Sequence, residues 1–181
     1  MPKRLVVDRS NLSQGLAHLE EMPEGVPEPL EGEIVVKIVA SGVCHTDLHM
    51  MDQDWPVKPA AHTPGHEGVG IVVKVGAAVS EFKVDDRVGC PWLGCACGQC
   101  TLCENGNENF CQCAKNTGYD VDGAWADYMR FNAKFAVHIP SALSSIQAAP
   151  ILCAGLTAFT ALRKSNVKAG EWVLITGMCS V

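Results

Sequence analysis

The densest run of cysteines in this chain, from Cys97 to Cys111, constrains its fold more than any other feature. Cys97, Cys100 and Cys103 are each separated by two residues, and Cys111 follows after seven more. This spacing turns the sulfur atoms toward a common point, where a tetrahedral Zn²⁺ accepts four thiolates at about 2.3 Å. The sequence therefore predicts a structural zinc lobe over residues 90–115, with these four cysteines as its ligands.

Two other uses of these thiols agree less well with the sequence. Disulfides need an oxidising compartment, and the N-terminus does not read as a signal peptide because its apolar run stops at Asp8. An iron–sulfur run continues as C-x3-C-P, whereas the last cysteine here comes far later and Gln112 follows it. The ligand set itself stays open at two points, since Cys95 could supply one ligand and Cys113 could replace Cys111.

Charge and cysteine content limit the partners and the compartment. The net charge of −6 argues against a nucleic-acid partner and against an anionic membrane surface. No apolar stretch approaches the ~20 residues that a membrane-spanning helix needs. Ten cysteines without a secretion signal indicate reduced thiols that serve metal in a cytoplasmic protein.

Residues 1–150 have the pattern of a mainly β domain. Short β-branched runs bounded by glycine and proline are typical of strands. Strands are predicted at residues 33–40, 71–75, 87–90 and 124–130, and residues 137–140 end this β-rich portion. Many short strands with such punctuation predict a barrel-like or sandwich-like body.

The hydrophobic period changes after residue 143. Ser144 and Gln147 have the spacing of a capping box, and Pro150 suits the first turn of a further helix. An apolar stripe at helical spacing follows, made of Leu152, Leu156, Phe159 and Leu162. Residues 171–176 predict a short apolar strand, and a strand that leads into a glycine, here Gly177, is how a dinucleotide-binding unit begins. Residues 151–181 are therefore interpreted as a connecting helix and the start of a second, incomplete domain.

Further metal-ligand residues occur in two polar motifs beside predicted strands. Residues 44–47 read CHTD and come just past the strand at 33–40; alone, they would be most simply a polar turn with a buried cysteine. Residues 65–68 read GHEG, and their glycines let the backbone turn tightly and bring the imidazole close to another element. A lone His-Glu is more often a surface pair. Cys153, beside the helical stripe, is on its own most simply a small buried hydrophobe.

Taken together, these motifs resemble one family. The run GVCHTD at 42–47, the run GHEGVG at 65–70, the four-cysteine lobe and the run PILCAG at 150–155 occur in the order seen in zinc-dependent medium-chain alcohol dehydrogenases. The sequence is most similar to the microbial ethanol dehydrogenases of yeast type. The resemblance implies a GroES-like barrel catalytic domain for residues 1–150. For residues 151–181 it implies a connecting helix and the first strand of a truncated Rossmann domain that carries NAD.

The resemblance also implies roles for the matched residues. The catalytic zinc would be bound by Cys44, His66 and Cys153, with Glu67 as the adjacent or exchanging ligand. The structural zinc would be bound by Cys97, Cys100, Cys103 and Cys111. Thr46 would contact the substrate and pass its proton outward, and Trp55 would line the substrate pocket. The cofactor would lie beside His45, Thr46, His49, Thr157 and Gly177.

The implied activity is NAD-linked oxidation of a small primary alcohol to its aldehyde. A zinc ion with an open position lowers the pKa of the bound alcohol, and the alkoxide then transfers hydride to the nicotinamide. The resemblance implies two zinc ions per chain and a homo-oligomeric full-length protein. The alternative function is a non-catalytic zinc-binding or interaction module.

Two departures from the family pattern modify these expectations. Asp52 stands where the yeast-type pattern ends its proton relay with a histidine, so a carboxylate would be the final proton acceptor and the pH–rate profile is expected to shift. Met50 and Met51 nearby are bulkier than usual. The phosphate-binding glycines, the ribose-binding acid and the returning strands of the family are also missing from this sequence. Because hydride transfer requires NAD to be held against the zinc, the chain alone is expected to show little or no turnover.

Overall fold

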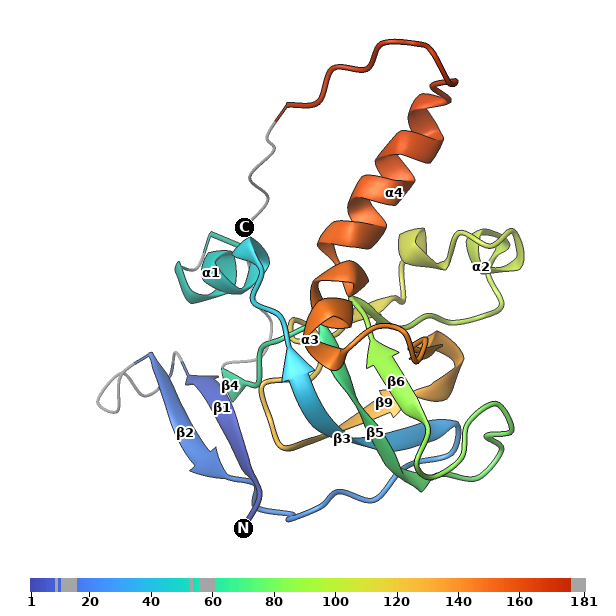
Figure 1. The fold of residues 1–181 in the computed structure, drawn as a ribbon. Coiled ribbons are helices and arrows are strands. Elements are labelled where there is room, and N and C mark those ends of the chain that lie inside the picture. The colour runs from blue at the N-terminus through green and yellow to red at the C-terminus, as the bar shows by residue number, and fades with distance from the viewer. Residues whose placement is uncertain (9, 11–15, 53, 56–60, 177–181) are drawn as a thin grey trace.

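A computed structural model describes residues 1–8, 10, 16–52, 54–55 and 61–176 of the chain. Its centre is a five-stranded antiparallel sheet with the strand order β10-β6-β5-β3-β9 (Figure 1). The strands of this sheet are β3 (Glu33–Ser41), β5 (Gly68–Val75), β6 (Arg87–Cys90), β9 (Tyr128–Asn132) and β10 (Val137–His138). The predicted mainly β body is confirmed, and the strands predicted at 33–40, 71–75 and 87–90 all lie in this sheet.

Two smaller sheets flank the central one. A three-stranded sheet has the order β2-β1-β4, and a two-stranded sheet pairs β7 with β8. Their strands are β1 (Lys3–Asp8), β2 (Ala17–Glu21), β4 (Ala61–His62), β7 (Leu93–Cys95) and β8 (Lys115–Asn116). The Leu5 N–H donates a hydrogen bond to the Trp125 carbonyl at 2.8 Å, which ties the N-terminal sheet to the chain that leads into β9.

The main hydrophobic core packs against the five-stranded sheet and consists largely of β-branched side chains from its strands. Ile34 and Val36 of β3, Val72 of β5 and Val88 of β6 are fully buried and belong to one cluster with Phe131. Burying a side chain of this size stabilises a fold by about 1.5–3 kcal/mol. The cluster therefore fixes the sheet whose strand ends carry the polar motifs at 44–47 and 65–68.

The strand predicted at 124–130 begins four residues later than expected, at Tyr128. The preceding residues hydrogen-bond elsewhere: the Ala124 N–H donates to the Gly65 carbonyl at 2.8 Å and the Trp125 N–H to the Pro64 carbonyl at 3.0 Å. These backbone groups are therefore satisfied by the 63–65 segment and not by β3. The shift places the 123–125 segment directly against the GHEG motif.

The helices are short except for the last one. They are α1 (His45–Asp52), α2 (Thr101–Glu104), η2 (Glu108–Phe110), η3 (Ala133–Phe135), α3 (Ser145–Ala148), η4 (Ala149–Leu152) and α4 (Ala154–Ser165). The predicted capping box is confirmed, since the Ser144 side chain accepts from the Gln147 N–H and the Gln147 side chain accepts from the Ser144 N–H. Pro150 lies in the first turn of η4. No single helix in the described residues is long and apolar enough to cross a membrane, although α3–η4 and α4, bent by 48°, reach that length and composition together.

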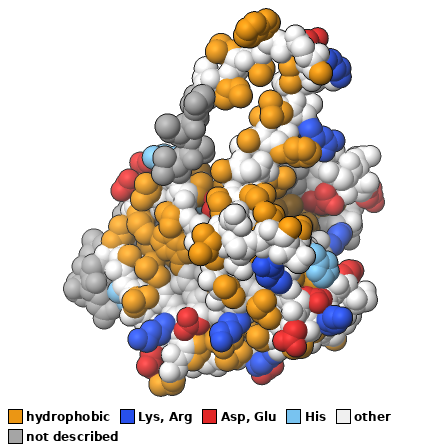
Figure 2. Space-filling model, in the orientation of Figure 1, with side chains coloured by type: hydrophobic (Ala, Val, Ile, Leu, Met, Phe, Trp, Pro, Cys, Tyr) orange, Lys and Arg blue, Asp and Glu red, His pale blue; other side chains and the backbone are white. Residues whose placement is uncertain are grey.

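Helix α4 projects from the β body, and the segment after it arches back toward α1 (Figure 1). The predicted apolar stripe is largely uncovered on this helix, where Leu156 and Phe159 are more than half exposed. Figure 2 shows hydrophobic side chains along the helix and the arch. The prediction of a strand at 171–176 is wrong for this structure, because those residues form no strand and Trp172 is fully exposed. A strand needs a neighbour to satisfy its backbone, and the described chain places none beside this segment; Gly177 lies outside the described residues.

Candidate metal centres

The first centre is the four-cysteine lobe, which α2 and η2 shape. The Sγ atoms of Cys97 and Cys111 are 3.5 Å apart, those of Cys100 and Cys103 are 3.5 Å apart, and those of Cys97 and Cys103 are 3.9 Å apart. A tetrahedron with metal–sulfur bonds of 2.3 Å has edges of about 3.8 Å. The lobe thus has the dimensions of a zinc site with four thiolate ligands.

Two neighbouring thiols that could have replaced a ligand lie outside this cluster. The four Sγ atoms that converge within 4.8 Å of one another belong to Cys97, Cys100, Cys103 and Cys111. Cys95 pairs with Lys115 in the β7–β8 ladder, and Cys113 is exposed. The backbone N–H of Cys113 instead donates to the Cys111 sulfur at 3.4 Å, which supports that ligand without replacing it.

The pKa values of the cysteine thiols in the lobe differ widely. Hydrogen bonds from the N–H groups of Cys97 and Cys113 lower the pKa of Cys111 to about 6, whereas burial raises the pKa of Cys103 to about 12. Metal ligation requires every sulfur as thiolate. A Zn²⁺ ion held by these four sulfurs would supply the positive charge that favours ionisation of the buried Cys103.

The second centre gathers residues from three distant parts of the sequence. Ligand atoms of Cys44, His66, Glu67 and Cys153 all lie within 4.8 Å of one another. Cys44 follows β3, the His-Glu pair precedes β5, and Cys153 joins η4 to α4. The Cys44 and Cys153 sulfurs are 3.9 Å apart although 109 positions separate them. The structure therefore brings together the set that the family resemblance had assigned to a catalytic zinc.

Glycines make this convergence possible. A Cβ added to Gly42 would collide with the Glu67 carboxylate, and Gly65 adopts a φ of +95° that an L side chain rarely takes. A Cβ on Gly123 would collide with the carbonyl oxygens of Gly65 and Pro64. The end of β3, the GHEG motif and the 123–125 segment can approach only because these positions lack side chains.

Gly123→Ala is therefore expected to destabilise the chain by about 2–3 kcal/mol, because its methyl group meets backbone atoms that cannot rotate away. Urea denaturation would measure the loss. Gly25→Ala is the control: Gly25 has a φ of +66°, but nothing lies within 4 Å of its added Cβ, so only about 1 kcal/mol is expected. Equal losses for the two variants would show that the close approach at Gly123 is unimportant.

Asp47 supports the second centre, although no role was predicted for it from the sequence. Its buried carboxylate accepts hydrogen bonds from the Cys44 N–H at 2.9 Å and the Gly65 N–H at 3.3 Å. Its Oδ1 also lies 3.6 Å from Nδ1 of His66, which leaves Nε2 as the ring nitrogen for a metal. In the sequence, Asp47 could be noticed only as a carboxylate three residues after Cys44. The fold shows that it also contacts the GHEG motif at Gly65.

The side chains of this centre fit a metal ion. His66 is 1% exposed, and neither ring nitrogen has a hydrogen-bond partner within the described ranges. Burial lowers the pKa of His66, but Asp47, Cys153 and Cys44 together raise it to about 10. A buried imidazole with unsatisfied nitrogens, beside two thiols and a carboxylate, is a donor set that zinc satisfies.

Asp47→Asn is expected to lower the zinc affinity of this centre by about 10–100-fold, the usual effect of losing an outer partner of a metal-bound histidine. Competition with a chromophoric chelator would measure it. Asp127→Asn is the control, since that exposed carboxylate also accepts a backbone N–H, from Lys3 at 2.8 Å, and should leave the affinity unchanged. An unaltered affinity in Asp47→Asn would remove the orienting role of this carboxylate.

The charge states of the other ligands follow from their surroundings. Burial raises the pKa of the Cys44 thiol, but hydrogen bonds from the backbone and hydroxyl of Thr46, together with His66, bring its pKa below the usual value. The Thr46 hydroxyl lies 3.6 Å from the Cys44 sulfur. Burial raises the pKa of Glu67. A thiolate at Cys44 can bind a metal ion, and the Thr46 hydroxyl beside it can accept a proton from a substrate.

The residues expected beside the cofactor are only partly gathered. His45 and His49 lie one turn apart on α1 with ring centroids 4.7 Å apart, and His49 stacks on Trp55 at 5.2 Å. Nδ1 of His49 is 2.7 Å from the Asp54 carboxylate. Thr157, also expected beside the cofactor, lies exposed on α4. Asp52, the predicted end of the proton relay, is exposed at the end of α1, and its side chain makes no hydrogen bond or ion pair among the described residues.

Two aromatic residues near the second centre were missed from the sequence. Trp92 stands edge-on to His66 with ring centroids 5.0 Å apart, and Tyr119 lies 5.9 Å from Trp92. Both come from loops, where their only signal was a large aromatic residue directly after Pro91 or Gly118. Sequence periodicity gives no information on where such loop side chains point.

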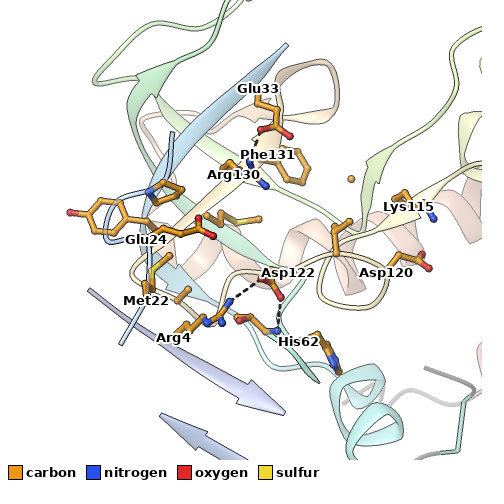
Figure 3. A pocket seen from close by; sticks show the side chains of 18 of the residues that line it. Arg4, Met22, Glu24, Glu33, His62, Lys115, Asp120, Asp122, Arg130 and Phe131 are labelled. Atoms are coloured by element: carbon orange, nitrogen blue, oxygen red, sulfur yellow. Dashed lines mark hydrogen bonds and ion pairs between the residues drawn. The ribbon is translucent and has the colours of Figure 1, made fainter. Parts of the chain in front are cut away.

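A cavity of about 580 Å³ lies away from both centres, between the N-terminal sheet, β9 and the β7–β8 pair (Figure 3). The eight converging metal-ligand residues are absent from its lining. Arg4 meets Asp122 there at 3.1 Å and Arg130 meets Glu33 at 3.8 Å. Two ion pairs therefore lie in the wall of this cavity.

A mainly β domain with one all-cysteine cluster and one mixed cluster of two cysteines, a histidine and a glutamate is typical of the class of zinc-binding GroES-like domains. The family model described as "Alcohol dehydrogenase GroES-like domain" matches residues 30–141. The chain belongs to this family.

Relatives and solved structures agree with the assignment. An alcohol dehydrogenase of Moraxella sp. is 50% identical to this chain over 154 residues, which cover 84% of this chain and 46% of the relative. An alcohol dehydrogenase of Geobacillus stearothermophilus is 52% identical over 153 residues, which cover 84% of this chain and 45% of that relative. The acetophenone reductase of Geotrichum candidum in complex with NAD has a TM-score of 0.82 at 26% identity, covering 94% of this chain and 49% of that one. The cobalt- and zinc-bound alcohol dehydrogenase of Pyrobaculum aerophilum has a TM-score of 0.83 at 24% identity, covering 94% and 50%, and shows the shared fold. The chain spans about half the length of the curated relatives it matches.

Proposed function

We propose that this chain is the zinc-bearing catalytic domain, residues 1–150, and the first part of the nucleotide-binding domain, residues 151–181, of an NAD-linked alcohol dehydrogenase. The observation that carries the proposal is the convergence of Cys44, His66 and Cys153, within a family domain that also holds a four-cysteine lobe. The substrate would be a small primary alcohol or its aldehyde. A cytoplasmic, homo-oligomeric full-length protein is part of the same proposal.

Each side chain has a defined task in such a reaction. Zinc held by this centre would supply Lewis-acid chemistry to the substrate oxygen. Cys44 and Cys153 would hold it as thiolates, and Asp47, whose Oδ1 lies 3.6 Å from Nδ1, would keep the His66 ring in the orientation that leaves Nε2 for the metal. The Thr46 hydroxyl, 3.6 Å from the Cys44 sulfur, would accept the alcohol proton and pass it outward.

The cofactor side of the proposal rests on α1 and α4. His45 and His49 lie one turn apart on α1, and the His49 ring stacks on Trp55. Thr157 lies one turn beyond Cys153, to whose carbonyl its N–H donates at 2.9 Å. These groups would contact NAD, while Asp52 would receive the outgoing proton at the exposed end of α1.

The test is a metal count followed by an activity assay. The purified chain is expected to hold two zinc ions, and NAD-dependent ethanol oxidation is then measured with the same sample. Two zinc ions without turnover would support the assignment of both metal centres and would show that this chain alone is inactive. A single zinc, confined to the cysteine lobe, would overturn the assignment of Cys44, His66 and Cys153.

One observation favours a second function, a non-catalytic zinc-binding interaction module. Leu156, Phe159 and Leu174 are each more than half exposed on α4 and the arch after it, and exposed apolar surface of this kind often marks a partner site. The size of the chain in solution tests this. A stable monomer at assay concentrations would argue against dependence on a partner.

A further inference from the structure

Strand β9 has an open edge on the side that faces away from β3. The Ile38 N–H donates to the Asp127 carbonyl at 2.9 Å where this ladder begins. Because bonded positions alternate along an antiparallel pair, the backbone N–H and C=O groups of Tyr128, Arg130 and Asn132 point away from β3. Within the described part of the chain, β3 is the only strand paired with β9. The outward backbone groups of β9 therefore have no ladder partner there.

The cavity of about 580 Å³ runs along this open edge, since every residue of β9 lines it. Strand β1 closes the edge only at its start, where Arg4 and Ala126 form an isolated bridge. No further pair joins β1 to β9 in the described residues, and the cavity occupies the space between them (Figure 3). Val121, which is 43% exposed, adds an apolar side chain to the lining. A groove with an unpaired strand edge as one wall is the arrangement that accepts an added strand.

Residues 171–176 are a strand sequence without a strand partner in the described chain. Trp172 is fully exposed and Leu174 is 88% exposed. When extended, these six residues span about 20 Å and the five of β9 about 17 Å, so the two lengths match. Figure 1 shows this segment beyond the projecting α4 at the top of the view and the N-terminal sheet at the bottom. The segment therefore lies away from the groove of its own chain.

We propose that residues 171–176 of one copy of this chain dock as an added strand against the open edge of β9 in a second copy. The outward backbone groups of β9 supply the hydrogen bonds. Trp172 and Leu174, as alternate residues, share one face of the added strand and pack against the apolar lining at Val121. The contact is head-to-tail, because strand and groove are different surfaces, so each pair of copies keeps one free strand and one free groove. This inference goes beyond the proposed function, and neither metal nor turnover enters it.

Two proline variants test the two sides of the contact separately. Arg130→Pro removes an N–H that faces the groove and takes no hydrogen bond from the β3 ladder, and edge strands tolerate proline at such positions. Leu174→Pro stops the segment from pairing as a strand and leaves the β body unchanged. In sedimentation velocity, the parent is expected to form dimers and longer species as its concentration rises. Each variant is expected to associate at least about tenfold more weakly, the scale of losing one or two backbone hydrogen bonds.

Mixing the two variants tests the head-to-tail geometry directly. Arg130→Pro keeps an intact strand segment and Leu174→Pro keeps an intact groove, so the mixture is expected to form a 1:1 dimer that does not extend. Arg130→Ala, which keeps the N–H, is the control for the groove. Leu156→Ser is the control for the segment, since it removes a 53% exposed apolar side chain from α4. Both controls should associate like the parent.

The outcomes decide between strand pairing and other contacts. A parent that stays monomeric at every concentration would overturn the proposal, and so would proline variants that associate as strongly as the parent. An equal loss in Leu156→Ser and Leu174→Pro would also overturn it, because association would then depend on the apolar face of α4. If circular dichroism shows that Arg130→Pro does not fold, Val121→Trp takes its place, because an indole at this exposed position fills the groove and should block association. Zinc content, measured on the same samples, keeps these results separate from the proposed function.

Discussion

Replacement of Cys103 by serine is expected to remove one of two zinc ions and to unfold the 95–115 segment. Cys103 is buried, and its sulfur lies 3.5 Å from that of Cys100 and 3.9 Å from that of Cys97. The lobe has little apolar core of its own, because most residues of α2 and η2 are exposed. Structural zinc contributes on the order of 10 kcal/mol of apparent binding free energy to small domains. Without that contribution, the lobe is expected to unfold.

Zinc content and limited proteolysis would measure this effect. We expect about one zinc per chain and new cleavage between residues 95 and 115. Cys113→Ser is the matched control, since that thiol is exposed, two residues from a ligand and outside the cluster; it should keep both metals and resist cleavage. Loss of zinc from Cys113→Ser with retention in Cys103→Ser would mean that the ligand set is different.

The lobe should also influence α4. The Lys164 ammonium lies 5.5 Å from the centroid of the Phe110 ring, which connects the end of α4 to η2. This exposed cation–π contact contributes only about 0.5–1 kcal/mol. Unfolding of the lobe is therefore expected to loosen α4 without displacing Cys153, whose segment is held by the buried Leu152.

Local chemistry made the strands and the lobe predictable from the sequence. The β-branched run at 33–40 forms β3, and Ser144 with Gln147 forms the predicted capping box, because both patterns act over a few neighbouring residues. Cysteines two residues apart can bind one ion for the same reason. Such features need no knowledge of distant parts of the chain.

Long-range placement limited the rest. The shift of β9 to Tyr128 arises because residues 123–125 hydrogen-bond with residues 63–65, a pairing that no local pattern indicates. Residues 171–176 have a strand sequence but no adjacent strand in the described chain, so propensity alone did not decide their structure. Asp47 and Tyr119 could not be assigned roles because their importance depends on contacts with His66 and Trp92 made only in the fold.

His66→Ala is expected to abolish zinc binding at the second centre while the lobe keeps its ion. The variant leaves two sulfurs and the Glu67 carboxylate around a space where the imidazole supplied the third strong ligand. It also removes the imidazole that lies 3.6 Å from the buried Asp47 carboxylate and forms an ion pair with it when protonated. The loss of affinity should exceed the about 10–100-fold that removal of an outer partner causes, because a direct metal bond is lost.

Metal analysis and cobalt spectroscopy would distinguish the two centres in this variant. We expect one zinc per chain, no cobalt absorption from a mixed sulfur–nitrogen site, and an unchanged pattern of proteolysis at 95–115. His138→Ala is the control, since that exposed histidine packs on Phe82 and belongs to neither ligand cluster, so this variant should keep two ions. A second zinc retained by His66→Ala would mean that the two cysteines and Glu67 bind metal without the imidazole. In that case the buried, unsatisfied ring nitrogens of His66 would need another explanation, and the case for a three-ligand Lewis-acid centre would be lost.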